Sequence, residues 1–231
     1  MKYEQICAGV YQIGGPGFST SSDCCMYLLD GGGKRAIIDC GTGSATKNVL
    51  ASIAKLAPDP GSIKYIVLTH GHIDHIGGIS GLMKAFPEAE TIAHRLELPA
   101  IEGGDMRLTA ADWYGVKYSG IKVDIVINDP PYEALEIGEM KLHFIHTPGH
   151  TPGSLSLLLD WDGSRILFGQ DIHGPFNQHW GSNMQDWRHS MQMLLDTKAD
   201  ILCEGHFGVI KPSTAVYRFI DGYMRNFAYH G

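Results

Sequence analysis

The segment THGHIDHIGG (residues 69–78) limits the folds open to this chain more than any other feature. It follows IKYIVL (63–68), an apolar run rich in β-branched residues that predicts a buried strand. In a helix, His70 and His72 would point about 200° apart, whereas in an extended segment they point to the same side. The histidines therefore belong on a loop that leaves the strand, and a helix is expected to begin near Asp74, where an acidic residue is favourable.

Three histidines and an aspartate stand within residues 70–75. A metal site explains this cluster better than the alternative of ordinary surface histidines, although the chain has 12 histidines in all. Further candidate ligands stand at the ends of later apolar strands. They are His150 after the strand 140–145, Asp171 after 165–169 and His206 after 199–203. A lone histidine is more often structural, but four strands that each end in a potential ligand favour a metal centre, since α/β proteins carry their sites at the carboxyl ends of strands.

The rest of the chain alternates strands and helices without a linker, so one domain over residues 1–231 is expected. The other predicted strands are 10–13, 25–30, 35–39, 90–94, 121–127 and 154–160, and the predicted helices are 45–57, 81–87, 187–197 and 213–230. Two regions give no clear pattern. The insertion 95–135 is expected to be helical in places, and the loop 172–186 is expected to form the rim of a cleft.

Composition limits the partners and the location. A formal charge of -7 disfavours a nucleic-acid partner, and no apolar run approaches the ~20 residues that span a membrane. Five cysteines without disulfide spacing, and no signal peptide, indicate reduced thiols in a cytoplasmic protein. The expected partner is a small-molecule substrate. The aromatic tail 217–230 covers either the core or a second subunit, so a homo-oligomer stays open.

The motif HxHxDH at residues 70–75, followed by His150, Asp171 and His206 in that order, resembles the metallo-β-lactamase-fold hydrolases, in particular the glyoxalase II-like and lactonase-like branch. The resemblance implies an α/β fold, a four-layer αββα sandwich of two mixed sheets with helices outside. It implies two metals in a cleft at one edge of the sheets. By this resemblance His70, His72 and His150 hold the first metal, Asp74, His75 and His206 hold the second, and Asp171 bridges both.

The sequence departs from several branches of that family. Position 72 is His, whereas the flavodiiron branch typically has Glu, and position 171 is Asp, whereas the main subclass of true β-lactamases has Cys. Antibiotic hydrolysis is therefore disfavoured. Only residues 207–231 follow His206, so the larger C-terminal helical domain of typical glyoxalase II enzymes is expected to be missing, which disfavours glutathione thioesters.

The expected chemistry is that of a binuclear hydrolase. Histidine and carboxylate ligands suit Zn²⁺ first and Fe or Mn next. Two such ions would share a bridging hydroxide that attacks an ester, thioester, lactone or phosphoester of a small molecule. Asp74 is the expected catalytic residue, which would orient the hydroxide and carry its proton toward the leaving group.

Other side chains are candidates for supporting roles. Asp39, at the end of a strand, is expected to accept a hydrogen bond from a ligand histidine, with Thr69 and Thr151 as weaker candidates. His173 is a substrate or ligand contact, or else an ordinary loop histidine. The aromatic residues Trp113, Tyr114 and Tyr118 form either a wall of the cleft or ordinary packing. His143, His189 and His230 are taken as structural or surface residues.

Two other enzyme classes compete. Persulfide dioxygenases resemble this family and use one iron, which His70, His150 and Asp171 would hold here. An RNA phosphodiesterase is less favoured, because the chain is acidic and lacks a long basic insertion. A non-catalytic binding module is the least favoured, because it would not need a complete set of metal ligands.

Overall fold

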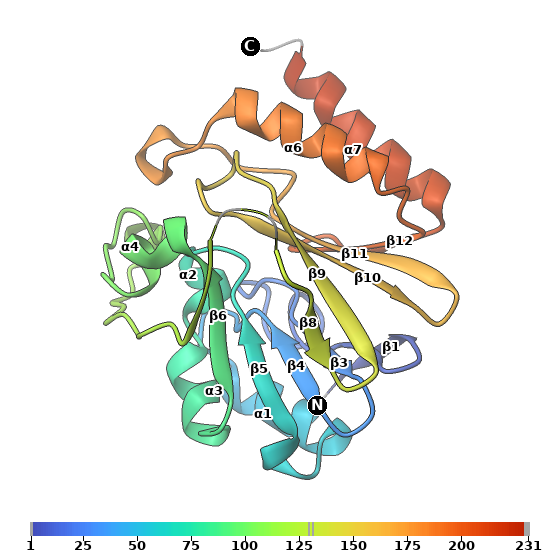
Figure 1. The fold of residues 1–231 in the computed structure, drawn as a ribbon. Helices are drawn as coiled ribbons and strands as arrows, with labels where there is room; N and C mark the ends of the chain where they lie inside the picture. Colours follow the sequence, from blue (N-terminus) through green and yellow to red (C-terminus); the bar gives the residue numbers. More distant parts are fainter. Residues whose placement is uncertain (1, 129, 131, 229–231) are drawn as a thin grey trace.

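The computed structural model describes residues 2–128, 130 and 132–228. Its strands form two mixed sheets that pack against each other (Figure 1). Within the described residues the first sheet has seven strands in chain order: β1 (Glu4–Cys7), β2 (Val10–Gln12), β3 (Tyr27–Asp30), β4 (Arg35–Ile38), β5 (Ile63–Val67), β6 (Glu90–His94) and β7 (Ile125–Ile127). Pairing is antiparallel from β1 to β4 and parallel from β4 to β7.

The second sheet comes from the later part of the chain. In the described residues its order is β13 (Gly208–Ile210), β12 (Ile201–Glu204), β11 (Ser164–Gln170), β10 (Leu155–Trp161), β9 (Met140–His146) and β8 (Leu135–Ile137). Only β11 and β12 pair in parallel among these neighbours, and the other pairs are antiparallel.

Helices cover the outer faces of both sheets (Figure 1). The helices α1 (Thr46–Leu56) and α3 (Ile79–Ala85) lie against the first sheet, and α6 (Met184–Asp196) and α7 (Ser213–Ala228) lie against the second. The short elements are α2 (Ile73–Ile76), α4 (Leu98–Ile101), α5 (Ala111–Tyr114) and the 3₁₀ turns η1 (Pro60–Ser62), η2 (Arg95–Glu97) and η3 (Gln178–Trp180). The predicted four-layer αββα arrangement of two mixed sheets is confirmed.

Three apolar layers hold these four layers together. Ile53 and Leu82 pack under the first sheet, and Met191 packs with Ile220 over the second. Between the sheets, β9 shows how the sequence sets the middle layer. Its residues alternate between buried and exposed, so Leu142 points inward while its neighbours point to the other face.

The sheets meet at the edge where several strands end. The strands β4, β5, β9 and β11 lead into loops there, and the backbone N–H of Leu155 donates to the carbonyl of Thr69 at 2.9 Å. That hydrogen bond joins the loop after β5 to the start of β10. The ends of strands from both sheets are thereby brought to one place.

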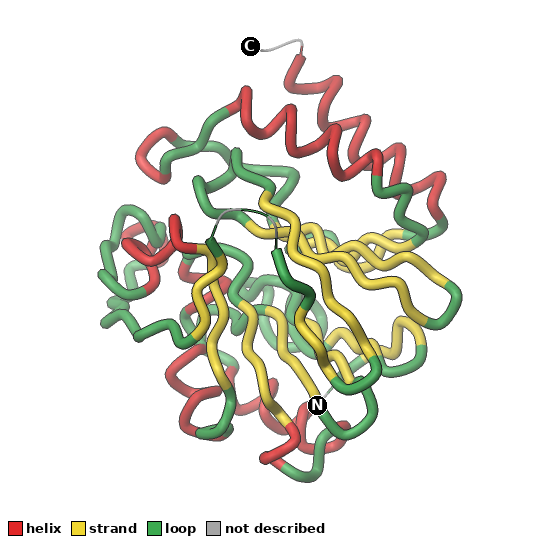
Figure 2. Tube along the Cα trace, in the orientation of Figure 1, coloured by secondary structure: helices red, strands yellow, loops and turns green. Residues whose placement is uncertain are grey.

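One predicted strand is shorter than expected. The sequence predicts a strand over 121–127, but only Ile125–Ile127 pairs with β6. The first part of the run is bound to α4 instead, because Ile121 N–H donates to the carbonyl of Ile101 and Val123 N–H donates to the Glu102 carboxylate. Most of the chain between β6 and β7 is loop with short helices (Figure 2). No helix in the described part of the chain combines the length and hydropathy that a membrane span requires.

Candidate metal centre

The histidine loop is extended, as its spacing predicts, and then turns into α2. His72 has φ −73° and ψ 146°, and it directly precedes that four-residue helix. Backbone N–H groups of Cys24 and Cys40 donate to the carbonyls of Asp74 and His75, at 3.2 and 2.7 Å. These contacts fix the short helix to the loops of the first sheet. All residues of α2 are buried, so their side chains point into the protein rather than into solvent.

Gly71 is required at the centre of the loop. A Cβ atom at this position would lie 2.6 Å from Cβ of Ala100 and 3.0 Å from Oε2 of Glu97. Any side chain would therefore push the insertion away from the histidines. The close approach of η2 and α4 to the loop depends on this glycine.

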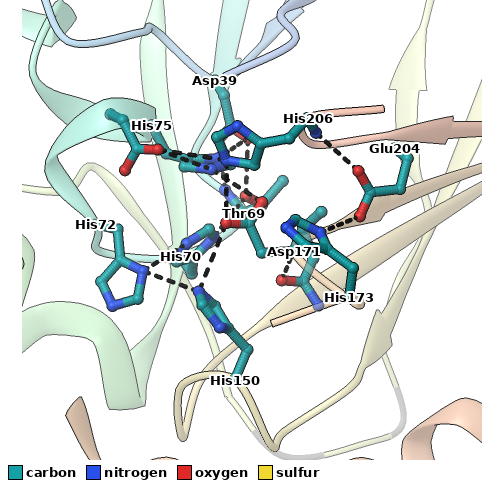
Figure 3. A network of polar contacts seen from close by, with 12 residues as sticks. Asp39, Thr69, His70, His72, His75, His150, Asp171, His173, Glu204 and His206 are labelled. Carbon is teal, nitrogen blue, oxygen red and sulfur yellow. Dashed lines mark hydrogen bonds and ion pairs between the residues drawn. The ribbon is translucent and has the colours of Figure 1, made fainter. Parts of the chain in front are cut away.

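The first donor set consists of His70, His72, His150 and Asp171, whose ligand atoms lie within 4.8 Å of one another. Nδ1 of His72 lies 3.1 Å from Nε2 of His70 and 2.8 Å from Nε2 of His150. Nε2 of His150 lies 3.6 Å from Oδ2 of Asp171. The three rings converge on one point although His150 is far from the other two in the chain (Figure 3).

The second donor set consists of Asp74, His75, Asp171 and His206, again within 4.8 Å. Nε2 of His206 lies 3.3 Å from Oδ2 of Asp74 and 3.1 Å from Oδ2 of Asp171. Nε2 of His75 lies 3.1 Å from Oδ1 of Asp171. The Asp171 carboxylate thus belongs to both sets, and the structure brings all seven predicted ligands together.

The donor atoms fit metal ions better than they fit one another. His75 Nε2 and Asp171 Oδ1 are buried and lie 3.1 Å apart, yet neither of them makes a hydrogen bond within the described chain. Buried polar atoms are otherwise almost always paired, because an unpaired one loses its solvation without compensation. Histidine nitrogens and carboxylate oxygens in sets of four match the ligands that Zn²⁺, Fe and Mn accept. The residues present therefore fit two divalent ions.

The two donor sets differ in their proton affinity. Burial lowers the pKa of His150 to about 4, and it also holds the pKa values of His70 and His72 well below the ordinary value. Burial opposes charge on His206 too, but contacts with Asp171 and Asp74 raise the pKa of His206 to about 10. The first set thus offers neutral imidazoles, the form that binds metals, whereas in the second set a proton takes the place of a cation.

Asp39 lies behind the histidines of the donor sets and contacts one of them. Its Oδ2 lies 2.8 Å from Nδ1 of His75, and it accepts hydrogen bonds from the N–H and the hydroxyl of Thr69 at 2.9 and 2.8 Å. The Thr69 hydroxyl is also 3.1 Å from Nδ1 of His70. Nδ1 of His150 lies 2.8 Å from the carbonyl of Pro175. Each of these contacts lies on the ring nitrogen that faces away from the donor set.

Glu97 is a supporting residue that the sequence does not reveal. It is buried, its Oε2 accepts from Gly71 N–H at 2.7 Å, and its Oε1 accepts from Gly153 N–H at 2.7 Å. The weaker candidate Thr151 contacts Ser154 instead of a histidine, because its hydroxyl lies 2.7 Å from the Ser154 hydroxyl. One carboxylate therefore ties the loop of His70 and His72 to the loop that carries His150.

Glu204 plays a similar part on the other side. It is fully buried, its Oε2 accepts from the N–H groups of His206 and Phe207, and its Oε1 lies 2.7 Å from Nδ1 of His173. His173 is thereby held at the wall of the site, and it lines the cavity that opens there. The only sequence signal for Glu204 is its place two residues before His206 in CEGH.

A cavity of about 200 Å³ opens above the donor sets. Besides the metal donors, it is lined by Ala110, Trp113, Tyr114, His173, Pro175 and Trp180. The insertion 95–135 supplies Trp113 and Tyr114, and the loop 172–186 supplies Trp180. Tyr118 packs against the core beside the first sheet instead, while His143 and His189 are exposed and His230 lies outside the described residues.

The model of the metallo-beta-lactamase superfamily matches residues 22–206 of this chain. Among curated proteins, the chain is 29% identical over 211 residues to the beta-lactamase-like protein 2 homolog of Caenorhabditis elegans. The matched residues make up 91% of this chain and 64% of that relative. The chain is also 26% identical over 215 residues to an atrochrysone carboxyl ACP thioesterase of Passalora fulva, and that match makes up 90% of this chain and 56% of the relative. The chain thus spans less than two thirds of the length of these two relatives.

A solved metallo-beta-lactamase of Cronobacter sakazakii superposes with a TM-score of 0.83 over 100% of this chain and 94% of the other. The identity is 22%, so this likeness concerns the fold. It agrees with the arrangement of two sheets and outer helices described above.

Proposed function

Because this chain belongs to the metallo-beta-lactamase superfamily, we propose that it is a binuclear metal-dependent hydrolase of a small-molecule ester, thioester, lactone or phosphoester. The observation that carries this proposal is the position of Asp171. Its Oδ1 faces His75, and its Oδ2 faces His206 and His150, so one carboxylate is shared by two complete donor sets. Relatives named as a thioesterase and as a hydroxyacylglutathione hydrolase support the choice of hydrolysis.

Each donor set would bind one ion. His70, His72 and His150 would hold one ion, Asp74, His75 and His206 would hold the other, and Asp171 would contact both. Divalent ions here, Zn²⁺ first with Fe or Mn as alternatives, supply a water that ionises near neutral pH and positive charge beside the electrophile's oxygen. Asp39, Thr69 and the carbonyl of Pro175 keep the imidazoles turned toward the ions.

Asp74 is the residue best placed to carry a proton. Asp74 lines the cavity together with Tyr114, and its Oδ2 lies 3.3 Å from Nε2 of His206. Hydrolysis joins a water oxygen to the acyl carbon or the phosphorus, breaks the bond to the leaving oxygen or sulfur, and returns one proton to that atom. A carboxylate at the cavity wall can accept the proton from the water and pass it on.

Metal content and turnover test this proposal together. Elemental mass spectrometry on full-length protein purified without added metal should find close to two ions per chain. The metal-loaded enzyme should hydrolyse at least one member of a panel of esters, thioesters, lactones and phosphodiesters. His206→Ala should lose one ion and most turnover, whereas His189→Ala, a change at an exposed histidine on α6, should keep both. If the protein instead contained a single iron and consumed oxygen in the presence of a persulfide, the hydrolase proposal would be wrong and the persulfide dioxygenase would be favoured.

A further inference from the structure

The cavity above the donor sets is short of positively charged side chains outside its histidines. None of its described lining residues is Lys or Arg. Apart from the metal donors and His173, the wall consists of Ala110, Trp113, Tyr114, Pro175 and Trp180. A carboxylate or phosphate on the part of the substrate away from the reacting bond would find no Lys or Arg there and only the His173 ring and the Tyr114 hydroxyl as polar partners, so its desolvation would be poorly compensated.

Two tryptophans form one continuous wall. The ring of Trp180 lies 4.5 Å from the ring of His72, centroid to centroid, so it stands directly over the first donor set. The ring of Trp113 lies 4.7 Å from that of Trp180, with an angle of 59° between their planes. Trp113 is 61% exposed, an unusual position for so large an apolar side chain.

Exposed aromatic surface gathers at the mouth of this cavity. Trp113 and Tyr114 line it, and Phe207, which is 54% exposed and lies outside the lining, directly follows His206. The Phe207 ring lies 5.0 Å from that of His173, which lines the cavity. Apolar side chains that remain in water around a pocket typically mark a surface that binds an apolar group.

The aromatic wall is fixed to the metal-binding segment. The N–H of Ile73, the first residue of α2, donates to the carbonyl of Thr109 at 2.8 Å. Ala110 and Gly115, which flank α5, both have left-handed backbone conformations, with φ of 53° and 63°. This local geometry turns Trp113 and Tyr114 toward the donor sets and holds them at a set position. A fixed wall selects substrates by shape and polarity.

We infer that the substrate is an ester or thioester whose acyl group is neutral and apolar, with a flat ring preferred, and that Trp113 and Trp180 bind this group. The inference rests on the proposed hydrolase function and narrows its substrate class. The acyl carbonyl lies at the donor sets while the ring lies against the tryptophans, where offset or edge-on aromatic contacts add to burial. Acidic acyl groups and phosphoesters with a charged remainder are poor substrates.

Three thioesters of the neutral thiol N-acetylcysteamine test this inference on the full chain loaded with zinc. The benzoyl thioester should have a kcat/KM at least tenfold above those of the acetyl and succinyl thioesters. Trp113→Ala should lower kcat/KM for the benzoyl thioester by about tenfold, mainly through KM, so that the preference for the benzoyl over the acetyl thioester is lost. Trp113→Phe should keep most of the preference. Tyr217→Ala removes another exposed aromatic ring, on α7 and outside the cavity, and should change neither kcat/KM value.

A binding measurement separates this inference from the hydrolase proposal. Benzamide, a neutral and unreactive analogue, should quench tryptophan fluorescence, and Trp113→Ala should weaken its binding about tenfold. Equal turnover of all three thioesters without an effect of Trp113→Ala would overturn the inference and leave the hydrolase standing. Benzamide binding that depends on Trp113, without turnover of any panel member, would support the apolar site and contradict the hydrolase.

Discussion

Nδ1 of His75 lies 2.8 Å from Oδ2 of Asp39, on the side of the ring opposite to the nitrogen that faces Asp171. With Nδ1 as the donor of this hydrogen bond, the lone pair of Nε2 points at the second donor set. The same Asp39 accepts two hydrogen bonds from Thr69, the residue directly before the first ligand histidine. One buried carboxylate therefore orients ligands of both sets.

Asp39→Asn should weaken the binding of the second ion by about 10- to 100-fold while the protein stays folded. An amide keeps the shape of the side chain but has one acceptor oxygen instead of two. Either the Thr69 N–H, or the Thr69 hydroxyl together with His75 Nδ1–H, therefore loses its acceptor. Zinc affinity measured by competition with a chromophoric chelator would show the loss. Asp196→Asn, at an exposed position near the end of α6, is the matched control and should bind zinc as the wild type does. Equal affinities in the two variants would contradict the role of Asp39.

Glu97→Gln should lower both the free energy of unfolding and the affinity of the first donor set. An amide retains one acceptor oxygen, so either Gly71 N–H or Gly153 N–H is left buried without a partner, at a cost of about 1–3 kcal/mol. Urea unfolding of the metal-free protein and zinc titration would measure the two effects. The comparison is with Glu88→Gln, where the carboxylate is 70% exposed and pairs with Lys64 at 3.0 Å. If zinc affinity were unchanged in Glu97→Gln, the carboxylate would be stabilising the fold alone.

The metal-free protein should be most stable near pH 6.5. The pKa of His206 is raised to about 10, so the stability from its charged form is complete below the unfolded value of 6.5 and is lost as the pH rises toward 10. The pKa of His150 is lowered to about 4, so the stability from its neutral form is lost as the pH falls from 6.5 toward 4.

Urea unfolding in the presence of EDTA, from pH 5 to 9, checks this profile. In His206→Gln the alkaline decline should become shallower, because the raised pKa has been removed, while the acid decline persists. A variant profile parallel to that of the wild type on the alkaline side would contradict the assignment.

Zinc should raise the midpoint of thermal unfolding, and EDTA should lower it reversibly. Ligand atoms for each ion come together only in the folded chain, so zinc binds the native state in preference to the unfolded one. At free zinc 100-fold above its dissociation constant the gain is about 2.7 kcal/mol for one site. The gain should be smaller in His206→Ala, which lacks a ligand of the second set. A midpoint that does not respond to zinc would mean that the donor sets bind no metal.

The sequence predicts the strands that carry ligands because the signals are local. An apolar run followed at once by His or Asp marks a strand end, and parallel pairing brings such ends to one edge. Glu97 escapes this kind of reasoning. Its partners are backbone N–H groups 26 and 56 residues away in the chain, and a backbone donor leaves no mark in the pattern of side chains.

Tertiary packing accounts for what else was misjudged. The run 121–127 has the composition of a strand throughout, yet its first half satisfies its N–H groups on α4. The short helix α5 is too brief to show a periodic pattern. Its start at Ala110 is also not predictable, because this residue has a left-handed backbone that alanine rarely adopts. The sequence therefore indicates the cleft walls as the regions 95–135 and 172–186 and offers Trp113, Tyr114 and Tyr118 as wall residues, of which the first two line the cavity. It does not predict the contact between Trp113 and Trp180.

Each donor set combines residues that follow strands of the first sheet with residues that follow strands of the second. Cutting the chain between the two sheets would therefore divide both sets. A break between β7 and β8 would leave His70, His72, Asp74 and His75 on one fragment and His150, Asp171 and His206 on the other. Neither fragment would hold a complete set. A metal ion would then be bound only when the two complementary polypeptides associate, so zinc retention would report their reassembly.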